Sequence, residues 1–227
     1  MSQKTQEHLR DQEVVDRAKD FWTKYSRPLM IASTVIILGA AGYFGYKYLI
    51  QQPNEEKSVE AIFKAEEYYR SDSLNLALNG DGVNPGFLRV IDKYGGTKAG
   101  NLAHFYAGDI YLKLGDYANA VKHLEDFKTS SEMIQARAYK LTADAYAGLN
   151  KTQEALKAYK KAAYHFEEDN VNSPDYLFLA AYYAHKVMNN SKEAVELYKD
   201  LKQKYPQSQQ GFEADKYLAQ LGIYAVK

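Results

Sequence analysis

The residue types best suited to catalysis and metal binding form no recognisable pattern in this sequence. The chain has no cysteine, which rules out disulfides and thiolate metal sites. A P-loop, a glycine-rich dinucleotide turn and a nucleophile elbow are also missing. We therefore expect no enzymatic activity, no cofactor and no metal. The histidines, none of which has metal-ligand spacing to another, are at positions 8, 104, 123, 165 and 185.

One short sequence, NGDG at residues 79–82, could be taken for the start of a calcium loop. Such a loop needs a series of alternate acidic residues that ends in a glutamate, and that series is missing. We therefore interpret these residues as a turn. His104 and His185 fall within predicted helices, where packing is the ordinary role and exposure in a groove is the alternative.

Length and charge narrow the class of protein further. The chain has 227 residues and a formal net charge of zero, with acidic and basic residues mixed throughout. This length allows one substantial core but not many domains. The mixed charge leaves no continuous basic surface for nucleic acid, so we expect no nucleic-acid partner. We also expect no small-molecule substrate. The 21 tyrosines and only 5 prolines favour a helical protein with aromatic residues packed between helices.

One segment differs from the rest of the chain. Residues 28–46, PLMIASTVIILGAAGYFGY, contain no charge, and Lys47 follows them. A helix of about 20 apolar residues crosses the roughly 30 Å hydrocarbon core of a bilayer, and a flanking lysine can reach the headgroups. A buried core helix would rarely continue so far without a polar residue beyond Ser and Thr. A cleaved signal peptide would have a shorter apolar region nearer the start. We predict a permanent anchor over residues 28–50.

Charges and aromatic residues beside this segment predict its orientation. More basic residues precede it than follow it, which favours a cytoplasmic N-terminus. Residues 1–27 then form an amphipathic cytoplasmic tail, and in a bacterium the chain beyond the span lies in the periplasm. Residues typical of the membrane interface are Trp22, Tyr25, Tyr46 and Lys47. The basic residues counted here are Arg17, Lys19, Lys24 and Arg27 before the span and Lys47, Lys57 and Lys64 after it.

Small residues in the span would let a second helix approach closely, although such residues are common in any span. They are Gly39, Ala41, Gly42 and Gly45. An apolar stripe at helical spacing precedes the span and consists of Val14, Ala18, Phe21 and Tyr25. This stripe indicates either a helix on the membrane surface or a docking helix for a cytoplasmic partner.

A third pattern occupies residues 106–127, YAGDIYLKLGDYANAVKHLEDF. Small and aromatic residues alternate at helical spacing around the turn residues Gly115 and Asp116. This pattern predicts two antiparallel helices, the first ending near Leu114 and the second starting near Tyr117. Gly108 and Ala120 are small enough to let the two backbones approach.

The pattern recurs, which indicates a repeat. Ala155 and Tyr159 follow 35 residues after the first copy, with Asn150 in place of the turn glycine, and Ala194 and Tyr198 follow 39 residues later. Asn can adopt the left-handed conformation that such a turn requires. The three copies resemble the tetratricopeptide repeat family, whose unit has about 34 residues. Pro206 stands where that family often ends its second helix.

This resemblance implies an all-α fold, with an N-terminal transmembrane helix followed by an α-solenoid. Residues 99–207 form three tetratricopeptide repeats, and residues 208–227 form a capping helix that covers the apolar end of the last repeat. Residues 51–98 form a divergent first helix pair, in which we expect residues 71–86 to be a long irregular connection.

In this family the first helix of each repeat lines a groove that holds peptides. The groove positions carried over are Leu102, Phe105 and Asp109 from the first repeat, Arg137, Lys140 and Asp144 from the second, and Tyr176, Leu179 and Tyr183 from the third. This wall is apolar at both ends and charged in the middle, which suits extended or partly unfolded segments. About half of these residues are expected to be buried by repeat stacking. Members that grip a C-terminal carboxylate need asparagine where Asp144 stands and lysine where Tyr176 stands, so that mode is not expected.

The whole layout resembles the ancillary Sec translocon subunit family of bacterial inner membranes. That resemblance implies a single-pass adaptor or holdase with translocon subunits, nascent secreted chains or periplasmic chaperones as partners. Residues 204–221 are also similar to repeats of periplasmic Tol-Pal and cell-division coordinator proteins, but we find neither their cleavable signal nor their coiled coil. Two alternatives stay open: a structural organiser of an envelope complex, and an organelle receptor whose repeats face the cytosol.

Overall fold

The computed structural model describes residues 3–224, with side chains described from residue 14 onward except that of Ala18. Across this described part the regular elements are all helices, which confirms the predicted all-α helical repeat fold. The chain divides into two units, Met1–Asn54 and Glu55–Lys227. Each unit is described by itself below.

The first unit consists of α1 (Gln3–Tyr46), the π-helical turn η1 (Lys47–Gln51) and the start of α2 (Gln52–Arg70). Pro28 lies inside α1, so the helix continues across the boundary between residues 27 and 28 that separates the predicted tail from the predicted span. Among the described residues, one helical stretch, Val14–Arg70, is long and apolar enough to cross a membrane by length and composition. Its most apolar window has a mean hydropathy of 1.7 and is not buried by the rest of the chain.

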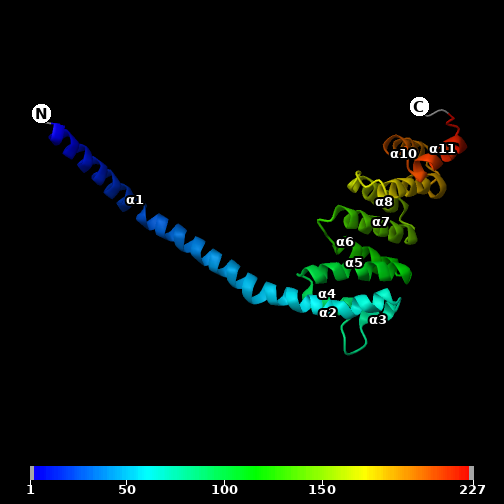
Figure 1. Ribbon diagram of the computed structural model, residues 1–227, viewed down its shortest axis with the longest axis horizontal. Helices are drawn as coiled ribbons and strands as arrows, with labels where there is room; N and C mark the ends of the chain where they lie inside the picture. The colour runs from blue at the N-terminus through cyan, green and yellow to red at the C-terminus, as the bar shows by residue number, and fades with distance from the viewer. Residues whose placement is uncertain (1–2, 225–227) are drawn as a thin grey trace. The chain divides into compact units, whose positions relative to one another are not determined.

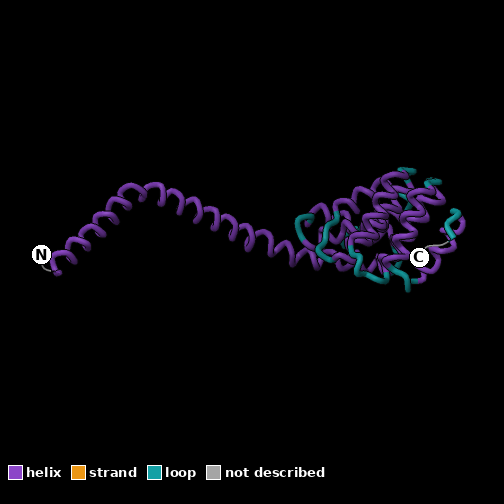
Figure 2. The backbone as a smooth tube through the Cα atoms, turned by 90° about the horizontal axis from the view of Figure 1, so that it is seen from above, coloured by secondary structure: helices purple, strands orange, loops and turns teal. Residues whose placement is uncertain are grey.

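The second unit is a stack of helices in chain order, from α2 and α3 at one end to α10 and α11 at the other (Figure 1). Its loops are short connections between helices (Figure 2). After α2 come α3 (Leu74–Asn79), α4 (Phe87–Tyr94), α5 (Lys98–Lys113), α6 (Tyr117–Asp126), α7 (Glu132–Gly148), α8 (Thr152–His165), α9 (Asn172–Tyr182) with the π-helical turn η2 (Tyr183–Val187), α10 (Ser191–Lys204) and α11 (Gln209–Gln220).

Left-handed residues separate the two helices of each pair. Gly115, Asn150 and Asn189 have φ of 78°, 57° and 52°, a range that glycine and asparagine enter more easily than other residues. The side chain of Asp116 then caps α6 by accepting a hydrogen bond from the Asn119 N–H at 3.2 Å. These bounds confirm the predicted helix end near Leu114, the start at Tyr117 and the left-handed turn at Asn150.

Small residues lie at the contacts between paired helices, as the repeat pattern predicts. Ala120, Ala155 and Ala194 are fully buried. Gly108 on α5 packs so closely on α6 that an added Cβ would lie 2.5 Å from the Leu124 Cγ. The absence of a side chain at Gly108 therefore sets how closely α5 and α6 approach.

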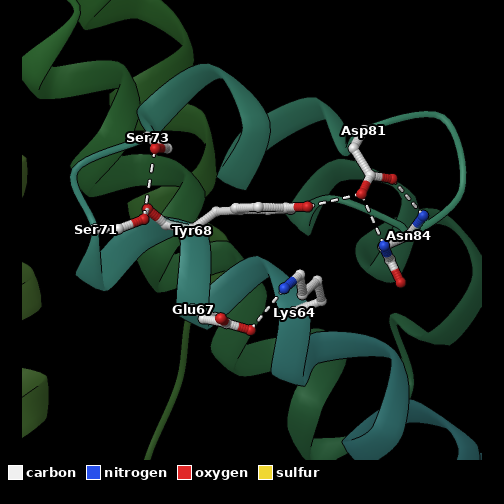
Figure 3. Close-up of polar contacts among 7 residues, drawn as sticks. All are labelled: Lys64, Glu67, Tyr68, Ser71, Ser73, Asp81 and Asn84. Atoms are coloured by element: carbon white, nitrogen blue, oxygen red, sulfur yellow. Dashed lines mark hydrogen bonds and ion pairs between the residues drawn. The ribbon is translucent and has the colours of Figure 1, made fainter.

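The connection after α2 is partly helical, so the expectation of an irregular segment is wrong for α3. Its NGDG turn closes around the Asp81 carboxylate (Figure 3). This carboxylate accepts hydrogen bonds from the N–H groups of Val83 and Asn84 at 2.8 and 2.6 Å, and from the Tyr68 hydroxyl at 2.7 Å. The hydrogen bond from Tyr68 and those from Asn84 lower the pKa of Asp81 below its ordinary value. The segment is a turn held by α2, as interpreted from the sequence.

The last helix covers the end of the stack. Ser208 caps α11 by accepting from the Gly211 N–H at 3.0 Å, and Leu218 is buried. The Tyr217 ring stacks on the Tyr198 ring of α10 at 5.3 Å between centroids. Phe212, which the sequence pattern counted among the apolar residues of this helix, is 63% exposed.

Candidate functional site

The predicted groove residues lie on the first helices of the repeats. Within α5, α7 and α9–η2 they recur at intervals of three and four residues, which places each group along one side of its helix. We call this surface the α5–α7–α9 face, made of Leu102, Phe105, Asp109, Arg137, Lys140, Asp144, Tyr176, Leu179 and Tyr183. Four of these residues, Phe105, Asp109, Tyr176 and Tyr183, are buried; Leu102, Lys140, Asp144 and Leu179 are half-buried, and Arg137 is exposed.

Both carboxylates of this face are already paired within the protein. Asp109 is buried, lies 2.8 Å from the Lys113 Nζ and accepts a hydrogen bond from the Tyr69 hydroxyl. Burial by itself would lower the pKa of Lys113, but the bonds to Asp109 and Tyr69 raise it above its ordinary value. These three groups join α2 to α5, so Asp109 has a structural partner rather than a free carboxylate.

Asp144 has an equivalent arrangement in the second repeat. Its two oxygens accept from the Lys140 Nζ and from the Tyr159 hydroxyl, each at 2.7 Å. Burial and then the charge of Asp144 raise the pKa of Tyr159, whose hydroxyl therefore stays a donor. The Tyr159 ring also lies 5.4 Å from the Tyr183 ring, which links α8 to η2. The charged middle of the face is thus largely neutralised from within.

Arg137 is the exception on this face. Its guanidinium carbon lies 5.8 Å from the centroid of the Phe105 ring on α5. On the α9 side, burial raises the pKa of Tyr176 and the charge of Arg137 opposes that rise. No carboxylate within the described part of the chain forms an ion pair with Arg137. An exposed guanidinium beside an aromatic ring can bind a carboxylate through two parallel hydrogen bonds.

One residue of this surface was missed from the sequence. Met133 lies four residues before Arg137, on the same side of α7, and is 52% exposed. A methionine adapts its shape to varied apolar partners. The spacing of Met133 from Arg137 was the signal that could have identified it.

Two histidines also come together, although they are far apart in sequence. The Nδ1 atoms of His104 on α5 and His123 on α6 are 3.1 Å apart, and the Tyr111 ring stacks on His123. Burial, followed by the neighbouring His104 and Lys122, lowers the pKa of His123 to about 4. Within the described residues, no group of three or more His, Asp and Glu side chains could hold a metal. The pair is a packing contact between the two helices of the first repeat.

The residues predicted for the membrane lie on α1 and η1. Trp22, Tyr25 and Tyr46 are 63%, 41% and 58% exposed, and Lys47 is the first residue of η1. An added Cβ at Gly39, Gly42 or Gly45 would meet no atom within 4 Å, and Ala41 is exposed. None of the described residues therefore covers the side of the helix formed by these small residues. Of the predicted upstream stripe, Val14 and Phe21 are exposed, and the side chain of Ala18 lies outside the description.

Comparison with known families agrees with the helix pairs. The tetratricopeptide repeat family model matches residues 102–130 and 175–208. These two segments fall on α5–α6 and on α9–α10, which are thus similar to tetratricopeptide repeats. No curated protein and no solved structure matches the chain significantly. Such repeats mediate protein–protein interactions and generally serve as scaffolds or adaptors rather than enzymes, which supports protein partners for this chain.

Proposed function

We propose that this protein is a membrane-anchored adaptor that binds extended or partly unfolded polypeptide segments on its α5–α7–α9 face. The observation that carries this proposal is the exposed Arg137, whose guanidinium lies beside the Phe105 ring and forms no ion pair with a described residue. Its neighbours Asp109 and Asp144 are occupied by internal partners, so Arg137 is the charged group left for a ligand.

The binding follows from these contacts. A carboxylate of the bound segment accepts two hydrogen bonds from the guanidinium of Arg137, which fixes the register of the segment. Apolar side chains on either side of that carboxylate contact the exposed Met133 and the half-buried Leu102 and Leu179. Because only a few anchors contact the segment, they give little sequence specificity. The face therefore suits many segments that share a composition, as a holdase requires.

The anchor is the second part of the proposal. The uncharged residues 28–46, with Trp22, Tyr25, Tyr46 and Lys47 at their ends, support a single span. The excess of basic residues before the span supports a cytoplasmic N-terminus and a periplasmic repeat unit. The resemblance in layout to ancillary Sec translocon subunits supports a narrower role beside the protein-conducting channel, with nascent secreted chains or periplasmic chaperones as clients.

Two other functions make different predictions. A structural organiser of an envelope complex would bind one stable partner, and an organelle receptor would expose its repeats to the cytosol. Because the chain has no cysteine, a single cysteine can be introduced at Ser2 or at Lys199. A thiol reagent added outside intact cells then shows which of the two positions it reaches. Lys199 suits this substitution because it is exposed on α10. Ser208 is less suitable, because its side chain caps α11. Labelling at Lys199 alone agrees with the proposal, and labelling at Ser2 alone overturns the orientation.

Photo-cross-linking tests the binding face directly. A photoreactive amino acid at Met133 should recover many different nascent or unfolded chains from growing cells. The buried Phe105 and Tyr183 are poor positions for this probe. The matched control is Glu196, an exposed residue on α10, which should recover few of the same chains. Equal recovery at both positions, or a single stable partner at Met133, would contradict the proposed function.

A further inference from the structure

A cleft of about 350 Å³ lies on another side of the repeats, between α6 and α8 and above α7. Tyr139, Thr142 and Tyr146 of α7 line it. At 100° per residue, these side chains lie on the side of α7 opposite to Arg137 and Asp144. The cleft is therefore separate from the α5–α7–α9 face.

Two hydroxyl groups in the floor of the cleft already have hydrogen-bond partners within the protein. The Thr142 hydroxyl donates to the Ala138 carbonyl of its own helix at 2.8 Å. The Tyr146 hydroxyl donates to Glu125 on α6 at 2.6 Å, and this hydrogen bond raises the pKa of Tyr146 to about 12. Leu124 lines the cleft and is 2% exposed. The hydroxyls of Thr142 and Tyr146 therefore need no hydrogen bond from a ligand, which otherwise meets the apolar Leu124 and the tyrosine rings.

The rim, in contrast, carries lysines without carboxylate partners. Lys157 and Lys161 are one turn apart on α8, and like charges at this spacing destabilise a helix. The Lys161 Nζ lies 4.0 Å from the centre of the Tyr139 ring. Neither lysine forms an ion pair with a described residue, whereas Lys160 between them is bound to Glu193 at 2.6 Å. The sequence keeps two unpaired positive charges at this cleft.

Other charges at the rim leave this end of the cleft basic. Lys128, two residues after the end of α6, also lines the cleft, and its Nζ donates to the Glu125 carbonyl oxygen at 2.6 Å. Of the acidic residues, the Glu125 side chain is engaged by the Tyr146 hydroxyl. Glu154 is in the first turn of α8 and lies three residues before Lys157, so it flanks the cleft at the end away from Lys161. The charge near Lys157 and Lys161 is complementary to an acidic group.

We propose that this cleft is a second binding site, which takes a short acidic segment of a protein partner. Carboxylates of the segment lie between Lys157 and Lys161, and one apolar or aromatic side chain rests on Leu124 and Tyr139. The volume is at the lower end of the roughly 300–1,000 Å³ typical of ligand sites, so it accommodates side chains rather than a whole helix. Because the site is on the opposite side of α7 from Arg137, the protein holds this partner and a client at the same time.

Selection from a random peptide library tests the site with full-length protein in detergent micelles. Peptides enriched on the wild type should combine acidic residues with an apolar or aromatic residue. In fluorescence anisotropy, Lys157→Glu/Lys161→Glu should weaken the enriched peptides at least tenfold, since two attractions become repulsions. The control Lys192→Glu/Lys199→Glu, on exposed positions of α10, should change the affinity less than twofold.

Further variants separate this site from the proposed function. Ala158→Trp fills the cleft and should abolish binding, whereas Arg137→Glu should leave it unchanged. Thermal unfolding checks that each variant is folded, and Lys157→Gln/Lys161→Gln replaces the charge reversal if that variant unfolds. The proposal is overturned if no peptides are enriched, if they lack acidic residues, or if the lysine variants bind them as well as the wild type. Phenylacetate that binds as tightly as the peptides would identify a small-molecule site and overturn it too.

Discussion

The contact between Gly108 and Leu124 allows the repeat packing to be tested by one methyl group. In Gly108→Ala, the new Cβ would lie 2.5 Å from the Leu124 Cγ and 3.2 Å from the Leu124 backbone nitrogen. The side chain can rotate, but the backbone nitrogen moves only with α6. Overpacking of this kind costs about 1–3 kcal/mol, offset by up to about 1 kcal/mol of improved helix propensity. We expect a net loss of about 1–2 kcal/mol.

The assay is urea unfolding of the full chain in micelles, followed by circular dichroism. The matched control is Gly96→Ala, because a Cβ at Gly96 would meet no atom within 4 Å and the backbone there is not left-handed. This control should change the free energy of unfolding by less than about 0.5 kcal/mol. A Gly108→Ala protein as stable as the control would refute the close contact between α5 and α6.

A double-mutant cycle sharpens the same prediction. Leu124→Ala alone removes a buried side chain and should cost about 2–5 kcal/mol. In the double variant the Gly108→Ala methyl group occupies part of the space that Leu124 left. The combined loss should therefore be at least about 1 kcal/mol smaller than the sum of the two single losses. Additive losses would show that the two positions do not touch.

Three further predictions concern other parts of the chain. Burial lowers the pKa of His123 from 6.5 to about 4, so the unfolded state binds more protons between these values. The free energy of unfolding should be highest above pH 6.5 and should fall by about 1–2 kcal/mol by pH 5. The same dependence on pH in His123→Phe would show that His123 is not its cause. Because φ of Asn150 is 57°, Asn150→Ala should lower the free energy of unfolding by about 1 kcal/mol, whereas Asn150→Gly should not. Equal Tm values for these two variants would contradict this prediction. An arginine at the centre of a span costs about 2.5–3.5 kcal/mol of insertion free energy, so Ile36→Arg/Leu38→Arg should release the protein from carbonate-washed membranes. The control Val59→Arg should stay in the membrane fraction. Retention of both variants would count against the anchor.

The helix pairs could be predicted because their signals are local. Gly115 and Asn150 mark turns through their own backbone preferences, and the alanines of the repeat are buried by helical periodicity. The helix α3 was missed because residues 74–79 lie between turn-forming residues and are too short to show a period.

The site could be predicted only in part, because its contacts join distant residues. The resemblance to the tetratricopeptide repeat family, whose groove positions were carried over, identified the side of α7 that carries Arg137. Asp109 and Asp144 each pair with a lysine one turn away, but their tyrosine partners, Tyr69 and Tyr159, come from other helices and have no signal near the carboxylates. The cleft depends in the same way on how α6 and α8 are spaced above α7, which no single segment encodes.

The most direct test of the central claim is the affinity of the α5–α7–α9 face for an unfolded chain. We would measure the Kd of a fluorescent, permanently unfolded polypeptide for the full-length protein in micelles by anisotropy. Arg137→Glu should weaken binding at least tenfold, whereas the control Arg89→Glu, at an exposed arginine of α4, should stay within twofold of the wild type. Equal affinity of both variants and the wild type would show that Arg137 is not the anchor and that this face is not the binding surface.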